Sequence, residues 1–268
     1  MQIHSTAIVH PKASLADGVE VGPFCVIGEH VTIGTGTRLF SHVTVDGWTE
    51  IGERNEVHPF VSIGGPPQHL GYKGEPTKVM IGDDNIFREY VTVNRATAQG
   101  GGITSIGNKN FLMAYVHVAH DCRLGSHLIM ANAASLAGHI TIGDHAIIGG
   151  LSGIHQFVRI GAYAMVGGCC ALGQDLPPFM RAAGGYRARM YGLNSVGLRR
   201  HGFSSDRVAV LKRAYDMLFR SGHRTAEAAR LANAEFGDQP DVMTVVKFLE
   251  GTRRGICRSV VKDQENEE

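Results

Sequence analysis

The chain has 268 residues, of which 43% are hydrophobic and 7% aromatic, and its formal net charge is +1. This composition is typical of a folded protein, and no apolar run is long enough to span a membrane. The N-terminal segment MQIHSTAIVHPKAS lacks the apolar region of a signal peptide, so we expect a soluble, cytoplasmic protein. The five cysteines form no C-x-x-C pair and are odd in number, which argues against a disulfide framework.

Aliphatic residues recur at every sixth position, and this repeat predicts the fold. One series runs from Ile3 to Ile63 and another from Ile106 to Leu172, as in IGEHVT, IGTGTR and LGSHLI. Six residues form a short strand and a corner, so three repeats form one triangular coil with the aliphatic side chains stacked inside. We therefore expect a mainly β protein, a parallel β-helix.

Two segments interrupt the repeat, and we expect them to form extruded loops near 64–79 and 98–103. Ile63 and Ile81 lie 18 positions apart, which predicts that the chain completes a whole coil around the first loop. Loops on a rigid scaffold often carry function, although a tolerated insertion is the simpler interpretation. Among the cysteines, Cys25, Cys122 and Cys170 share one repeat position, where we expect small, buried, reduced side chains.

Helical patterns with capping residues replace the repeat after QDLPPF: SSDRVAVLKRAYDMLFRSG, TAEAARLANAEFG and PDVMTVVKFLEG. We expect a β-helix domain over 1–185, a small helical C-terminal domain over 190–256 and a flexible tail over 257–268. Residues 181–262 hold 16 Lys or Arg against 7 Asp or Glu. Such an excess is often only a solvated surface, but it would also suit an anionic partner.

The stretch YVHVAHDC combines His117, His120 and Asp121. If residues 18 apart stack, Gly138 and Gln156 lie in line with His120, and His139 and His155 flank that line. By contrast, we expect three outward histidines to be solvated: His4, His30 and His145.

Three interpretations of the stacked histidine group remain open. The group could decorate the surface, or its imidazoles could converge on a metal at about 2.0–2.1 Å. It could also contain a general base, because neutral imidazole accepts protons near pH 7. Asp121 can orient His120 only if a corner separates them, because adjacent strand residues point to opposite faces.

Several motifs carry a resemblance to a known family: AHDC, LAGHITIGDHAIIGG, IHQFVRIGA, VGGC, QDLPPF, KGEPT, IGDDNIFRE and RRHGFS. Together they resemble the UDP-N-acetylglucosamine O-acyltransferases, a hexapeptide-repeat family with a left-handed β-helix that opens lipid A synthesis. The resemblance implies transfer of a 3-hydroxyacyl chain from acyl carrier protein to the sugar 3-hydroxyl. It implies a homotrimer with sites between subunits and no metal or cofactor, and we expect no nucleic acid partner and no stable membrane insertion.

The resemblance also assigns roles to single residues. His120 is implied as the general base, Asp121 as the group that orients it, and Gly138 as an oxyanion-hole donor. Gly168 matches the position that limits acyl length, and its lack of a side chain implies a longer chain. Substrate contacts are implied for His117, His139, His155, Gln156, Gln68, His69, Gly71, Asn194 and Arg200.

The chain departs from the family pattern at positions that would read the sugar nucleotide: His69, Gly71, Asn94, Val196 and His201. Gly71 replaces a lysine, which would suit an acceptor carrying a 3-amino group, because a lysine would repel the ammonium form. N-acylation of a 3-amino UDP-sugar is therefore an alternative, and drift is the simpler explanation. A trimeric zinc carbonic anhydrase is a further alternative.

Overall fold

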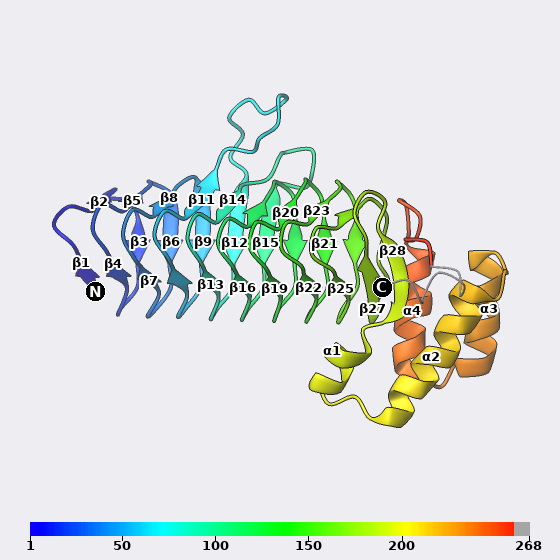
Figure 1. Cartoon of the computed structure of the whole chain (residues 1–268). Coiled ribbons are helices and arrows are strands. Elements are labelled where there is room, and N and C mark those ends of the chain that lie inside the picture. The colour runs from blue at the N-terminus through cyan, green and yellow to red at the C-terminus, as the bar shows by residue number, and fades with distance from the viewer. Residues whose placement is uncertain (260–268) are drawn as a thin grey trace.

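The computed structural model describes residues 1–259, which wind into a triangular solenoid followed by helices (Figure 1). Each face of the solenoid is one sheet. The first sheet contains β1 (Gln2–Ile3), β4 (Glu20–Val21), β7 (Arg38–Leu39), β10 (Glu56–Val57), β13 (Ile86–Phe87), β16 (Phe111–Leu112), β19 (Ile129–Met130), β22 (Ile147–Ile148), β25 (Met165–Val166), β27 (Met180–Ala183) and β28 (Arg189–Leu193).

The other two faces follow the same pattern. The second sheet contains β2 (Ile8–Val9), β5 (Val26–Ile27), β8 (Thr44–Val45), β11 (Ser62–Gly65), β14 (Thr92–Asn94), β17 (His117–Val118), β20 (Ser135–Leu136), β23 (Gly153–Ile154) and β26 (Ala171–Leu172). The third contains β3 (Ser14–Leu15), β6 (Val31–Ile33), β9 (Trp48–Ile51), β12 (Lys78–Ile81), β15 (Ile103–Ile106), β18 (Arg123–Leu124), β21 (Thr141–Ile142) and β24 (Arg159–Ile160).

The repeat positions stack as the sequence predicts. Strands pair in parallel with the coil above, so Leu124 pairs with Ile142 and Ile142 with Ile160. These side chains are buried, whereas Ile3 in the first coil is 43% exposed because no coil covers it. Each coil therefore buries its apolar residues against its neighbours, as in other solenoids.

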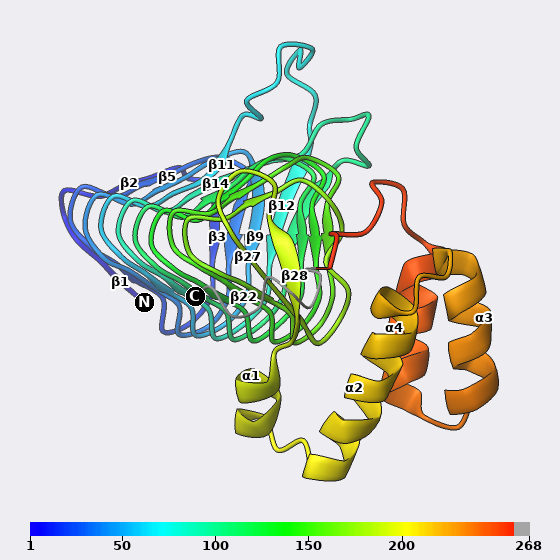
Figure 2. The same cartoon turned by 45° about the vertical axis from the view of Figure 1, so that its right-hand side comes forward.

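Both expected loops leave the same corner, between the second and third sheets (Figures 1 and 2). The first joins β11 to β12 and the second joins β14 to β15. The prediction of a whole coil between Ile63 and Ile81 is wrong, because β11 and β12 are consecutive strands of one coil. Ile81 pairs directly with Ile51, so the register continues across the loop as if it were absent.

A ladder of buried polar side chains runs inside the solenoid. The Asn55 Oδ1 accepts hydrogen bonds from the Asn85 backbone and side-chain N–H groups, both at 2.9 Å. Asn85 Oδ1 accepts from the Asn110 N–H at 2.9 Å, and Asn110 Oδ1 accepts from the Leu128 N–H at 2.8 Å. Since all three asparagines are at most 1% exposed, the ladder satisfies groups that water cannot reach.

The C-terminal part contains α1 (Ser195–Arg200), α2 (Ser205–Arg220), α3 (Thr225–Phe236) and α4 (Pro240–Glu250). The three longer helices match the predicted segments, and Ser204 caps α2 by accepting from the Arg207 N–H. Residues 189–193 form β28, so the helices begin later than the expected start at residue 190. None of the helices in residues 1–259 is long and apolar enough to cross a membrane.

Residues 257–259 do not behave as the expected tail. The Cys257 N–H donates to the Asp175 oxygen at 2.9 Å, and the Cys257 side chain is 2% exposed. Asp175 thus joins the last coil to the segment after α4, helped by a 2.8 Å bond from the Thr252 hydroxyl. Residues 260–268 lie outside the described part of the chain.

The cysteines predicted as fillers are confirmed as buried and free. Burial raises the pKa of Cys122 to about 12 and that of Cys170 to about 11, so both thiols are protonated at neutral pH. They act as small apolar side chains in the solenoid.

Asn85→Ala should destabilise the protein, because it removes two partners of the ladder. The buried Asn55 oxygen and the Asn110 N–H would each lose a hydrogen bond, at about 1–3 kcal/mol apiece. Urea unfolding would measure the loss, with the exposed Asn132→Ala as the matched control. Equal stability of the two variants would contradict a structural role for the ladder.

Candidate active site

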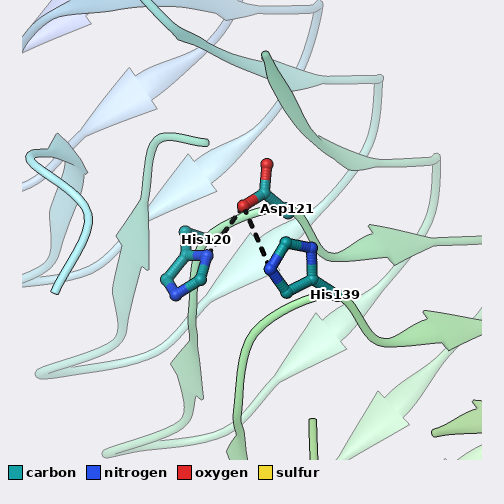
Figure 3. Close-up of side chains that lie close together, drawn as sticks. All are labelled: His120, Asp121 and His139. Carbon is teal, nitrogen blue, oxygen red and sulfur yellow. Dashed lines mark hydrogen bonds and ion pairs between the residues drawn. The ribbon is translucent and has the colours of Figure 1, made fainter. Parts of the chain in front are cut away.

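A corner directly after His120 builds the candidate site. Asp121 has a φ of 63°, which turns the chain between β17 and β18 and folds the carboxylate back toward His120. His120 Nδ1 lies 2.7 Å from Asp121 Oδ2 (Figure 3). Both residues are buried, at 8% and 5% exposure. The corner expected between His120 and Asp121 is therefore present, and it brings the carboxylate within hydrogen-bond distance of the imidazole.

His139 approaches the same carboxylate from the next coil. Its Nε2 lies 3.7 Å from Asp121 Oδ2 (Figure 3). Its ring stands edge-on to His120 at 5.1 Å and stacks on Phe157. The pKa of His139 is lowered, and burial is the largest cause. The charge of Asp121 partly opposes this shift. His139 is therefore neutral at pH 7, and Asp121 is paired mainly with His120.

The ligand atoms of His120, Asp121 and His139 all lie within 4.8 Å of one another, so this group could hold a metal ion. Imidazole and carboxylate are suitable ligands for zinc. The Asp121 oxygens already accept three hydrogen bonds from Thr97, as well as the contact with His120. A metal would have to displace some of these donors.

Gly138 lies directly against the His120 ring, which confirms the stacking predicted from their separation of 18. A Cβ atom at Gly138 would lie 2.5 Å from His120 Cε1 and 2.9 Å from Nε2. No side chain fits at this position, so the Gly138 backbone and the free side of the imidazole face one another.

A groove of about 710 Å³ opens beside this pair on the second sheet. Its floor is formed by outward-facing residues of β17, β20, β23 and β26, and much of its lining is apolar, including Ala119, Ala137 and Ala171. A concave, mostly apolar cleft with a few polar groups is the usual form of a small-molecule site. Five of the predicted residues line it: Gln68, His117, His120, Gly138 and His155.

The first loop covers one side of the site. Its His69 ring stands edge-on to His120 at 5.4 Å, and the Gly71 N–H donates to His69 Nδ1 at 3.1 Å. A Cβ atom at Gly71 would meet the His69 ring at 2.9 Å. Asn94 holds the base of this loop through a 2.7 Å bond to the Pro66 oxygen. Of the altered positions of the family pattern, His69 and Gly71 therefore contact each other, and Asn94 bonds to the base of the same loop.

Asn194 and Arg200 do not reach the groove of the same chain. The Asn194 side chain caps α1 by accepting from the Gly197 N–H at 3.2 Å and donates to the Tyr163 oxygen at 3.0 Å. Tyr163 lies at the corner between the third and first sheets, away from the corner that holds Asp121. His201 packs there against His145 and Tyr163, while Val196 at the start of α1 is exposed.

The structure corrects or leaves open several further expectations. His145 is not fully solvated as expected, since it is half-buried between His127 and Tyr163 and burial lowers its pKa. His30 is exposed but stacks on Trp48.

Gly168 lies against the Gly150 backbone and outside the groove lining of the single chain. Gln156 is not among the residues that line the groove, and its backbone oxygen lies 3.2 Å from His155 Nδ1.

Sequence reasoning missed two residues at the site. Thr97, in the second loop, donates hydrogen bonds to Asp121, and Arg254 places Nη2 3.1 Å from His155 Nδ1. Thr97 lies one residue before the expected loop, but no local sequence pattern indicates its contact with Asp121. Arg254 follows α4, and nothing in the local sequence indicates its contact with His155.

Comparison with known proteins agrees with the resemblance. A family model described as "Udp N-acetylglucosamine O-acyltransferase; Domain 2" matches residues 175–257. The acyl-[acyl-carrier-protein]–UDP-N-acetylglucosamine O-acyltransferase of Thermodesulfovibrio yellowstonii is 54% identical over 96% of this chain and 99% of its own length. The enzyme of the same name from Syntrophobacter fumaroxidans is 47% identical over 96% of this chain and 100% of its own length.

Solved structures show the same architecture. The LpxA structure from Acinetobacter baumannii superposes with a TM-score of 0.94 at 44% identity, and the alignment covers 96% of this chain and all of that one. The UDP-N-acetylglucosamine acyltransferase of Francisella novicida superposes with a TM-score of 0.94 at 38% identity over 100% of this chain and 99% of its own.

The predicted left-handed parallel β-helix with a helical C-terminal part is thereby confirmed. This fold, with an imidazole–carboxylate pair beside a groove, defines a hexapeptide-repeat acyltransferase. The chain belongs to the UDP-N-acetylglucosamine O-acyltransferase family.

The stability of the protein should fall as the pH drops below about 6.5, the ordinary histidine value. The pKa of His117 is lowered in the folded protein, mainly by burial and to a smaller extent by the charge of the nearby His120. The unfolded chain therefore binds this proton first, and the free energy of unfolding falls until His117 is also protonated in the folded state. His117→Gln should flatten this dependence in urea unfolding at pH 7.5 to 5, whereas the exposed His4→Gln should not.

Proposed function

We propose that the protein transfers a 3-hydroxyacyl chain from acyl carrier protein to the 3-hydroxyl of UDP-N-acetylglucosamine, the first step of lipid A biosynthesis. The observation that carries this proposal is the His120–Asp121 pair, which faces Gly138 at the edge of an apolar groove. The names of the relatives, which match over nearly the whole chain, support the same activity.

The chemistry follows from the tautomer of His120. Asp121 accepts a hydrogen bond from Nδ1, so the lone pair is on Nε2, where it can remove the proton of the acceptor hydroxyl. The resulting oxygen nucleophile attacks the thioester carbon and forms a tetrahedral oxyanion. As the C–S bond breaks, the carrier thiolate takes the proton from the His120 imidazolium. Asp121 stabilises that imidazolium while it exists.

The Gly138 N–H supplies the oxyanion donor in this scheme. One directed donor at a developing oxyanion contributes about 2.7–4 kcal/mol. Because Gly138 lies against the His120 ring, the donor and the base act on the same small region. No metal or cofactor takes part in the proposed reaction.

Polar groups that line the groove or lie beside it would orient the two substrates. We assign contacts with the sugar nucleotide and the acyl donor to His117, His139, His155, Gln156, Gln68 and His69. The absence of a side chain at Gly168 favours a longer acyl chain.

The remaining assignments require more than one copy of the chain. Asn194 and Arg200 lie at another corner of the solenoid, so they could contact the nucleotide phosphates bound in the groove only from a neighbouring subunit. We therefore propose a homotrimer with sites between subunits, acting in the cytoplasm. The basic residues of the C-terminal part suit the acidic carrier protein.

His120→Ala should lower kcat/KM for acyl transfer by roughly 10²–10⁴-fold, the usual contribution of a general base. The measurement is transfer from purified 3-hydroxyacyl carrier protein to UDP-N-acetylglucosamine, with the distant His4→Ala as the control. A His120→Ala enzyme as active as the control would exclude this mechanism. Stoichiometric zinc bound by an inactive wild-type protein would instead favour the carbonic anhydrase alternative.

The wild-type protein should prefer the hydroxyl sugar over its 3-amino analogue, in keeping with its O-acyltransferase relatives. The two acceptors are assayed side by side. Preference for the amine would make the first loop the selective element, and Gly71→Lys should then shift the preference back, because the added ammonium repels a charged acceptor. Leu70→Lys, at a fully exposed position of the same loop, is the matched control for charge.

A further inference from the structure

The second loop returns to the solenoid at Asp121, and Thr97 makes the contact. The Thr97 hydroxyl donates to Asp121 Oδ2 at 2.7 Å, and the Thr97 N–H lies 3.1 Å from Oδ1 and 3.3 Å from Oδ2. Thr97 is 6% exposed and Asp121 is 5% exposed, so water does not substitute for these bonds. Both carboxylate oxygens are therefore held by one residue outside the His120–Asp121 pair.

The hydroxyl of Thr97 has little freedom to turn away. Its oxygen accepts a hydrogen bond from the Gly100 N–H at 3.1 Å, which leaves its own hydrogen to point at Asp121. Gly100 lies so close that a Cβ atom there would come within 2.4 Å of every heavy atom of the carboxylate group. The loop can close on Asp121 only because this residue is glycine.

The imidazoles of His120 and His139 both lie near the Asp121 carboxylate, so the orientation of this carboxylate decides which of them it binds. His120 Nδ1 is 2.7 Å from Oδ2, while His139 Nε2 is 3.7 Å from the same oxygen. The Asp121 backbone is fixed by its N–H bond to the Thr104 hydroxyl at 2.8 Å, but that bond leaves the carboxylate free to rotate. Thr97 prevents this rotation.

We infer that Thr97 is a positioning residue, which holds the Asp121 carboxylate on His120 and away from His139. The inference deepens the proposed function and rests on it, because it takes His120 as the base. Thr97 acts through Asp121 and does not touch the reacting atoms. Loss of the Thr97 hydroxyl would leave the groove lining unchanged. The His120 ring would then occupy several orientations instead of one.

Thr97→Val, which keeps the side-chain shape, should lower kcat by roughly ten- to hundredfold, the range seen when an imidazole loses the partner that orients it in metal sites. KM for both substrates should stay within about twofold, since no substrate contact changes. Thr97→Ser keeps the hydroxyl and should restore most of kcat. Thr44→Val, at an exposed position of β8, is the matched control.

Three outcomes would overturn the inference: a kcat of Thr97→Val equal to that of the wild type, an equal loss in Thr97→Ser, or a rise in KM that accounts for the whole loss. Melting temperatures of all variants separate positioning from unfolding, because a positioning role predicts a kcat loss at temperatures where every variant is folded.

A second readout does not depend on activity. The Nδ1–H proton of His120, assigned by its absence in His120→Ala, should be visible by NMR in the wild type and in Thr97→Ser, and shifted or exchanged away in Thr97→Val. If the wild type transfers no acyl group but this signal behaves as described, the proposed function fails and the positioning role stands. If the wild type is active and the signal is the same in Thr97→Val, only the role of Thr97 is wrong.

Discussion

The register between successive coils is the constraint on which the rest of the molecule depends. Each aliphatic side chain stacks on its equivalent in the next coil, as Leu124 does on Ile142, and the backbone hydrogen bonds follow that alignment. A shift of one residue would turn every inward side chain outward. The same alignment places Gly138 on His120 and His139 beside Asp121, so the site is a consequence of the fold and not an addition to it.

The carboxylate of Asp121 is the electrostatic centre of the site. Its two oxygens serve one imidazole directly, a second at longer range, and the hydroxyl and N–H of Thr97. A buried carboxylate needs such donors, because burial without them would favour its protonated, neutral form. The neighbouring histidines His117 and His139 have pKa values lowered by burial, so the site is not crowded by positive charge at neutral pH.

Much of the fold follows from the sequence, because the repeat and the capped helices are local patterns. The adjacency of His120 and Gly138 follows as well, since it needs only the spacing of 18. The prediction of a whole coil between Ile63 and Ile81 is wrong because their spacing of 18 happens to equal the length of one coil. In the structure this segment contains one corner of the solenoid with the first loop inserted in it. The contacts of Thr97 and Arg254 could not be predicted, because each joins segments whose approach is set by tertiary packing.

Both loops interrupt the solenoid without disturbing it. Ile81 sits on Ile51 and Ile106 on Ile81, although the chain between each pair is longer than a coil. The strand register of the solenoid is therefore kept whatever the length of either loop. For protein engineers, the first loop at the corner between the second and third sheets is therefore a grafting point, where new recognition segments could be exchanged while Thr97 of the second loop keeps its bonds to Asp121.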